Sequence, residues 1–464
     1  MRRALLFLLF ISAIPLRAQQ PPPIDPPGEP AKLKENCFSP ALFTFAGLGG
    51  CAEELFTGVP VHIAVGSIAP QNGFGGGVAY VGHHTTDNWR NNWNADGIAS
   101  GNGSWRAGVY AKFVHTPAEP VIATIGPPPP ENDHPVDLNE HTIFGLYAQA
   151  ISLNKITFFG LGPNTTEAGR TYFGMTETIV GGNIVKPLSG FLNTSLFAEV
   201  NGRFVNIRES NGQNSPSISQ LYNEATAPGL NSQPGTFQLG EGIRIRPVFA
   251  ADVVRLNYSA SYQQFFATDN FTFQRLTVDL GHQFILHTKT FINEPRLNNG
   301  PDACANGIDK HSPCPKPYAR NFSGSIGFRF FTALSMTPGG NTVPFYYQPT
   351  LGGSDINGNS SLTSYQDYRF RAPDVMYLRE NFEHSIWDLP IGFMLAADQG
   401  KVALTRGGLG SSPWIHSFSA GLTLRAGGFP QVSLLFSWGG NEGTHTIANV
   451  NTSLLGGTSR PSLF

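Results

Sequence analysis

Strict alternation of apolar and polar residues recurs along most of this 464-residue chain, and it limits the fold more than any other feature. In segment 105–114, Trp105 and Val109 fall on one side of the chain, and Arg106 and Lys112 fall on the other. A period of two residues is that of a β-strand. The sequence therefore predicts an all-β protein. The same alternation recurs in segments 254–263, 276–284, 322–330, 418–425 and 432–438.

A soluble β-sandwich also shows this alternation, so the pattern alone leaves two classes of protein open. Only 13% of the residues are charged, about half the ~25% of an ordinary soluble domain. The repeat continues for about 400 residues without a helical interruption, and aromatic residues cluster near the strand ends, both of which favour a membrane barrel. We therefore expect a transmembrane antiparallel β-barrel of the outer-membrane type, with about sixteen strands between residues 59 and 464. Its last strand is expected at 444–455.

The N-terminus predicts export. Arg2 and Arg3 precede an apolar run that ends before a small-residue cleavage site at Ala18, the pattern of a signal peptide over residues 1–18. A retained membrane anchor is the alternative, but the run is too short to span a bilayer. Residues 19–58 begin with a proline-rich stretch that cannot build a core, so we expect a periplasmic tether with a short cap. These features predict export to the bacterial envelope, and with the expected barrel they predict the bacterial outer membrane as its location.

Four cysteines form two close pairs, Cys37 with Cys51 and Cys304 with Cys314. In an oxidising compartment we expect two local disulfides, although three connectivities are formally open. Zinc is the alternative for the second pair, but the tight CxxC spacing of a zinc site is missing. We therefore expect no metal, and a short cap closed by the first pair.

Connections between the strand candidates differ in length. Long ones at 209–236 and 337–373 fit one end of a barrel, and those at 126–134 and 293–320 are assigned to the periplasmic end. Short turns at 251–252, 388–390 and 427–430 also fit a barrel.

Several function classes are unsupported. A net charge of −2 shows no basic footprint for nucleic acid. The nucleophile-elbow, zinc-protease and phosphate-loop patterns are absent from the sequence. Asp355, Asn357 and Asn359 begin like a calcium loop, but Ser360 and Gln366 stand where glycine and glutamate are required. We therefore expect neither enzymatic activity nor a cofactor.

The C-terminal third carries four ordered motifs. They are VPFYYQPTLGGSD at 343–355, LTSYQDYRFR at 362–371, a strand at 375–387, and PIGFMLAADQGKV at 390–402. Together they resemble the bacterial surface antigen superfamily of outer-membrane barrels, of the BamA/TamA type. The resemblance implies that 337–373 is the long sixth extracellular loop, which folds into the barrel lumen. It also implies that Asp398 and Gly400 form the Asp-x-Gly motif of the thirteenth strand.

The loop departs from the family pattern. The family has an arginine, a glycine and an aromatic residue that lock the loop to acids on strands twelve and thirteen. Here Thr363, Ser364 and Tyr365 stand in those places, and Asn381 stands at the acid of strand twelve. Threonine cannot imitate a guanidinium that binds carboxylates. The remaining loop residues assigned to this lock are Asp367, Tyr368, Arg369 and Arg371.

We expect Arg369 or Arg371 to reach Asp398 in place of the missing arginine. The alternative is that both arginines face headgroups or solvent.

The resemblance implies a function in assembly, insertion or translocation of outer-membrane proteins, which would be the clients, at a weak seam between the first and last strands. About 40 residues separate Ala18 from the first strand, so we expect no periplasmic POTRA domain. Two alternatives stay open: a passive pore and a structural surface protein. Outer-membrane lipids are expected partners in each case. In a pore, ion selectivity would be set by Arg106, Lys112, Arg255, Arg275, Arg329 and Arg425.

Overall fold

The computed structural model describes residues 60–116, 141–188, 192–210, 216–247, 253–291, 318–387, 389–426, 429–440 and 442–450. Apart from Pro60, these residues belong to one compact unit, Val61–Phe464. The signal peptide, the tether, the four cysteines and the chain beyond Val450 lie outside the described residues.

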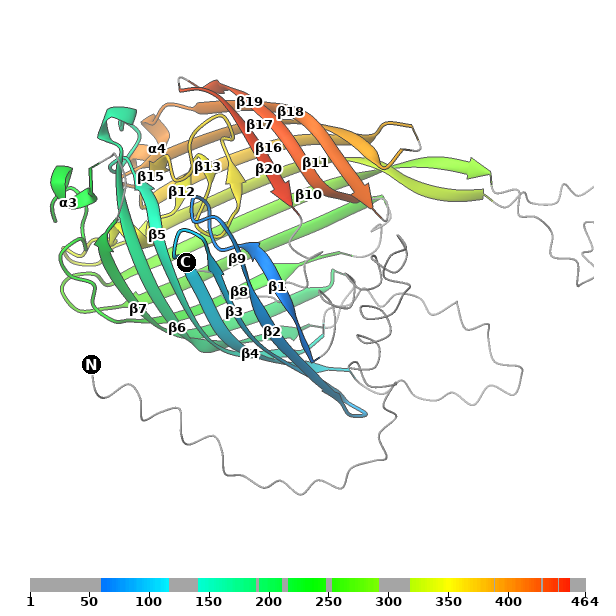
Figure 1. The fold of residues 1–464 in the computed structure, drawn as a ribbon, viewed down its shortest axis with the longest axis horizontal. Coiled ribbons are helices and arrows are strands. Elements are labelled where there is room, and N and C mark those ends of the chain that lie inside the picture. The colour runs from blue at the N-terminus through cyan, green and yellow to red at the C-terminus, as the bar shows by residue number, and fades with distance from the viewer. Residues whose placement is uncertain are drawn as a thin grey trace, which may run out of the picture. The chain divides into compact units, whose positions relative to one another are not determined.

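Within the described residues, sixteen strands form a single antiparallel sheet in chain order, so the predicted all-β fold and strand number are confirmed (Figure 1). Each strand pairs with its neighbours in the sequence, except that β11 pairs with β16 because four short strands intervene. The sixteen are β1 (Val61–Ser67), β2 (Phe74–Thr85), β3 (Trp89–Ser100), β4 (Trp105–His115), β5 (Ile143–Phe158), β6 (Thr171–Pro187), β7 (Thr194–Glu209), β8 (Thr236–Ile245), β9 (Val254–Phe266), β10 (Phe273–Phe291), β11 (Tyr318–Met336), β16 (Asp374–Ser385), β17 (Ile391–Ala403), β18 (Ile415–Ala426), β19 (Phe429–Gly440) and β20 (Gly443–Val450).

The other elements are short. Strands β12 and β15 form one small sheet and β13 and β14 another, all inside the connection between β11 and β16. No helix in the described part of the chain is long and apolar enough to cross a membrane. The short elements are β12 (Thr350–Leu351), β13 (Gly353–Ser354), β14 (Ser360–Ser361), β15 (Phe370–Arg371), the 3-10 helices η2 (Glu167–Gly169) and η3 (Phe345–Tyr347), and the helices α3 (Ile218–Leu221) and α4 (Gly408–Ser411).

Burial along the strands is the reverse of that in a soluble protein. In β18, Phe418, Leu422 and Leu424 are 46%, 56% and 55% exposed, whereas Ser417 and Ser419 are 0% and 2% exposed. The polar side chains of this strand therefore lie on the face that the loop 337–373 contacts, which we call the inner face. The apolar side chains lie on the outer face.

Two buried apolar clusters lie where this loop meets the sheet. The first joins Phe345, Tyr346 and Tyr347 of η3 to residues of β5, β6, β9 and β10. The second joins Tyr365 and Phe370 of the loop to residues of β11, β16 and β17. The core of the described unit is therefore formed largely between the loop and the inner face.

Candidate functional site

The loop 337–373 carries most of the residues that the sequence assigned to a site, and its first part is an aromatic turn. Phe345 is fully buried, with its ring centroid 5.2 Å from that of Phe158 in β5 and 5.1 Å from that of Phe173 in β6. The Phe345 N–H donates to the carbonyl oxygen of Pro228, in the β7–β8 connection, at 2.8 Å. The turn therefore fills the space between several strands and a second connection.

Two buried arginines hold the backbone of this turn. Arg275 of β10 donates through Nη2 to the Tyr347 carbonyl oxygen at 2.6 Å. Arg371 of β15 donates through Nη1 to the carbonyl oxygens of Phe345, at 2.8 Å, and Gln348, at 3.4 Å. Burial lowers the pKa of Arg371 to about 10. Carbonyl oxygens thus accept hydrogen bonds from the Nη atoms of both buried guanidinium groups, whereas neither Nε atom has a hydrogen-bond partner among the described residues.

Asp398 of β17 lies at the centre of a buried polar cluster. The Thr363 N–H donates to Oδ2 at 3.3 Å, and the Thr363 hydroxyl lies 3.5 Å from the same oxygen. Tyr377 donates its hydroxyl to Oδ1 at 2.8 Å, and Arg379 Nε lies 3.3 Å from Oδ1. Arg379 and Asp398 are direct cross-strand partners in the β16–β17 register. The loop therefore binds an acid whose charge is compensated from the neighbouring strand.

This arrangement corrects the expected pairing of Asp398. Arg369 binds Glu442 and Arg371 binds carbonyl oxygens, and both side chains are buried rather than at headgroups or solvent. Asn381 lies opposite Ala396, and Arg379 occupies the position across from Asp398. Because cross-strand side chains approach to about 5 Å, β16 can supply the cation without help from the loop.

The remaining motif residues fasten the loop to the inner face. Ser364 donates its N–H to the Ser417 hydroxyl at 2.8 Å, and the Tyr365 ring packs edge-on against Phe370 at 5.0 Å. A Cβ added to Gly400 would lie 2.9 Å from Leu351 Cδ1 and 3.1 Å from Leu362 Cδ1. Glycine at this position therefore allows the loop to approach β17 closely.

The last motif residues, Asp367, Tyr368 and Arg369, reach the first and last hairpins of the sheet. Tyr368 contacts the β1–β2 connection, and Arg369 contacts the β19–β20 connection at Glu442. Burial raises the pKa of Asp367, against a lowering hydrogen bond from the Ser354 N–H. Burial also raises the pKa of Glu442, although Arg369 lowers it.

Sequence reasoning missed Arg379 and Glu442 as partners. Counting outward from the short turn at 388–390 places Arg379 opposite Gln399, one residue away from Asp398, which is its partner in the observed register. Glu442 lies in a two-residue connection with no periodic signal. Among the described residues, no group of three or more His, Cys, Asp or Glu side chains could hold a metal ion.

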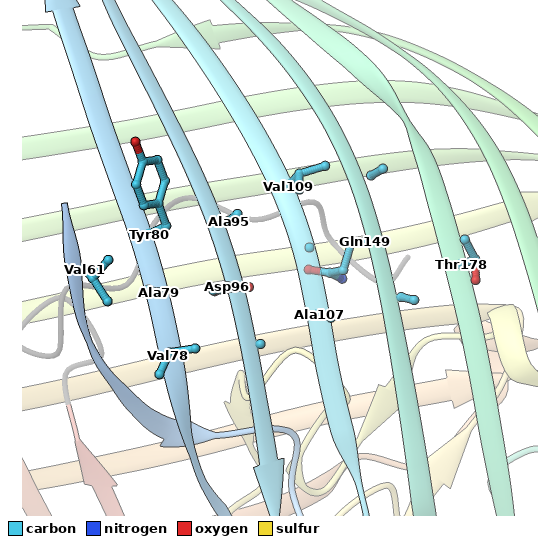
Figure 2. A pocket seen from close by; sticks show the side chains of 14 residues that line it. Val61, Val78, Ala79, Tyr80, Ala95, Asp96, Ala107, Val109, Gln149 and Thr178 are labelled. Carbon is cyan, nitrogen blue, oxygen red and sulfur yellow. The ribbon is translucent and has the colours of Figure 1, made fainter. Parts of the chain in front are cut away.

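A hollow of about 630 Å³ lies on the outer face over β1 to β6 (Figure 2). It arises because alanine and glycine occupy neighbouring outer positions in the middle of β3, β4 and β5, beside the larger Tyr80 and Val109. Its lining includes Val61, Val78, Ala95, Gly97, Ala107, Ala148 and Ala150. The hollow is thus part of the apolar outer face.

The sheet and its inverted burial define the class of a β-barrel-type membrane protein. A comparison with solved structures finds several outer-membrane proteins to which this chain is similar in structure. CdiB from Escherichia coli is 13% identical with a TM-score of 0.47, over 84% of this chain and 61% of that one. CdiB from Acinetobacter baumannii is 11% identical with a TM-score of 0.44, over 83% and 57%. BamA from Haemophilus ducreyi, solved without POTRA domains 1–3, is 9% identical with a TM-score of 0.46, over 84% and 69%.

This chain thus spans about three fifths of the length of the two CdiB chains. The chain matches no protein-family model and no curated protein sequence.

Proposed function

We propose that this chain is an integral outer-membrane β-barrel whose outer face contacts lipid. The inversion of burial supports this proposal, because apolar side chains are exposed in strand after strand while charged ones are buried. In water, an exposed apolar surface of this extent would be unfavourable, whereas in a bilayer it replaces contacts between acyl chains. The predicted signal peptide at 1–18 supports export to the same location.

Within that class, we infer a function in assembly or insertion of other outer-membrane proteins. The observation that carries this inference is the loop 337–373, whose residues contact β17, β18 and the connections of both end hairpins. The loop packs side chains against part of the inner face and contacts the connections at both ends of the sheet order. The surface-antigen motifs support the same function, with client barrels as partners and no cofactor.

A passive pore is the second candidate, because many inner positions carry arginine. Three of the six predicted inner-face cations have acceptors, however, and two of these acceptors are acids. Arg425 pairs with Glu383, Arg329 Nη2 lies 2.8 Å from Asp279 Oδ2, and Arg275 is bound to a loop carbonyl. Paired arginines give little of the field that would select anions. The arrangement therefore favours assembly over conduction.

The test uses the full chain in liposomes together with an unfolded small client barrel. We expect the client to fold faster than in empty liposomes, without steady ion leakage from the same vesicles. An unrelated barrel at the same density controls for bilayer defects. Leakage without acceleration of client folding would establish the pore instead. If neither leakage nor acceleration occurs, the remaining candidate is a structural surface protein.

A further inference from the structure

Two adjacent loop residues contact opposite ends of the sheet. Tyr368 donates its hydroxyl to the Pro70 carbonyl oxygen at 3.1 Å, in the connection between β1 and β2. Arg369 donates through Nε to Glu442 Oε1 at 2.5 Å, in the connection between β19 and β20. Since β1 and β20 are the first and last strands in the sheet order, the same short segment joins its two end hairpins.

The Arg369 side chain is held in place by contacts other than its ion pair with Glu442. Its Nη1 and Nη2 atoms donate to the Thr165 hydroxyl and carbonyl oxygens, both at 2.7 Å. Its guanidinium carbon lies 4.5 Å from the Phe370 ring centroid and 4.8 Å from that of Phe159. Glu442 therefore binds a guanidinium that has little freedom left to lose, which makes the ion pair stronger than a flexible surface pair.

The first hairpin is held by two bonds. Besides the Tyr368 contact, Gln71 hydrogen-bonds to the Asp367 carboxyl group. Tyr368 is buried and has a φ of +61°, a conformation that a non-glycine residue keeps only when its surroundings hold it. The backbone at 367–369 is therefore shaped to present both side chains.

Glycines behind this segment make the shape possible. Gly352 and Gly353 have φ values of +102° and +59°. A Cβ on Gly352 would lie 2.6 Å from Arg369 Cβ, and one on Gly353 would lie 2.5 Å from the Asp367 backbone nitrogen. Only glycine accommodates both the backbone conformation and this contact.

We propose that Asp367, Tyr368 and Arg369 form an edge latch, a contact that holds the first and last hairpins of the sheet together and must break before its two edges separate. The latch deepens the proposed function and rests on it in one respect: separation of the edges is the step that would admit a client strand. The contacts themselves belong to this chain alone.

Hydrogen–deuterium exchange on the full chain in lipid nanodiscs tests the latch directly. The Tyr368→Phe/Glu442→Ala double variant loses one bond to each hairpin while keeping the aromatic ring and the Arg369–Thr165 contacts. We expect exchange of residues 61–67 and 443–450 to become roughly tenfold faster, with β9 unchanged. Asp279→Asn is the matched control, because it breaks an inner-face pair far along the sheet order and should leave both edge strands at the wild-type rate.

Two results would overturn the latch: wild-type exchange at both edges in the double variant, or an equal increase in every strand. The single variants Glu442→Gln and Tyr368→Phe, which change the structure least, should each give a smaller increase at their own hairpin. The proposed function is tested separately, by the client-folding experiment. If the wild-type chain does not accelerate client folding, the proposed function fails, but the exchange result for the latch still stands. If the latch and the proposed function are both correct, the double variant inserts the client faster than the wild-type chain does.

Discussion

At the scale of single residues, Asp398 shows how the loop is held at this point without an arginine from the loop. Thr363 supplies a backbone N–H and a hydroxyl, and Arg379 supplies the positive charge from the adjacent strand. The Asp398 side chain is 1% exposed and that of Arg379 is 16% exposed. An acid this deeply buried depends on its partner, because an unpaired buried charge is costly.

We expect Arg379→Met to lower the free energy of unfolding by about 3 kcal/mol, because it leaves Asp398 buried and uncompensated. Urea titration in detergent micelles measures this change. Arg329→Met is the matched control on the neighbouring strand, since its pair with Asp279 is 39% and 28% exposed and should contribute less than about 1 kcal/mol. Equal losses in the two variants would contradict the special position of Asp398.

Asp367 should make stability depend on pH. Burial raises its pKa in the folded chain, so its contribution to stability is complete below the unfolded value of about 3.9 and is lost as pH rises through the folded value. Asp367→Asn removes this loss. We expect the thermal midpoint to fall less between pH 4 and pH 7 in the variant than in the wild type. Asp87→Asn, at an exposed turn, should keep the wild-type pH profile, and the same profile for Asp367→Asn would disprove the assignment.

At the scale of elements, the loop 337–373 is attached to the large sheet at two places, and the small sheets lie in the loop between them. The aromatic turn η3 belongs to the cluster with β5, β6, β9 and β10, whereas Tyr365 and Phe370 belong to the cluster with β11, β16 and β17. Sequence motifs located the loop and the residues near Asp398. They could not show which distant strands each part contacts, because such contacts depend on the curvature and register of the whole sheet.

Phe345→Ala should detach the first part of the loop. The side chain is fully buried against two other aromatic rings, so its loss should cost about 3 to 5 kcal/mol of unfolding free energy. Limited proteolysis in nanodiscs should then cut within 337–350 faster than in the wild type. Leu221→Ala, at a side chain that is 54% exposed in α3, should change neither quantity measurably. Unchanged cleavage in Phe345→Ala would show that the rest of the loop holds the turn.

At the scale of the whole molecule, the period of two residues was sufficient to predict the sheet. Because successive side chains point to opposite faces of a strand, the outward positions stay apolar and exposed at places far apart in the chain, such as Val109 in β4 and Phe436 in β19. Strand ends were less predictable. The last strand was expected at 444–455 and is described as Gly443–Val450, with the following residues outside the described part. Polar residues continue the alternation past a strand end, so the pattern does not mark it.

The proposed contact of the outer face with lipid has a direct consequence for charge substitutions. Leu422, in the middle of β18 and 56% exposed, should tolerate arginine poorly, at a cost of about 2 to 4 kcal/mol in liposomes. Asn206→Arg, near the loop end of β7, should cost at most about 1 kcal/mol, since charge is cheaper near the interface. Folding titrations in urea with liposomes give both values. Similar small costs at both positions would argue that water, rather than lipid, covers this face.

The latch contacts also set an order of events during folding. Pro70 lies 298 residues before Tyr368, and Arg369 lies 73 residues before Glu442. Closing such long loops of chain is slow and yields no stabilisation until most intervening strands have paired. The first hairpin therefore cannot be joined to the last one until most of the strands between them have paired. The join between the two hairpins is the final step of the chain's own assembly, and a chain truncated before residue 442 would reach the membrane with that step permanently unfinished.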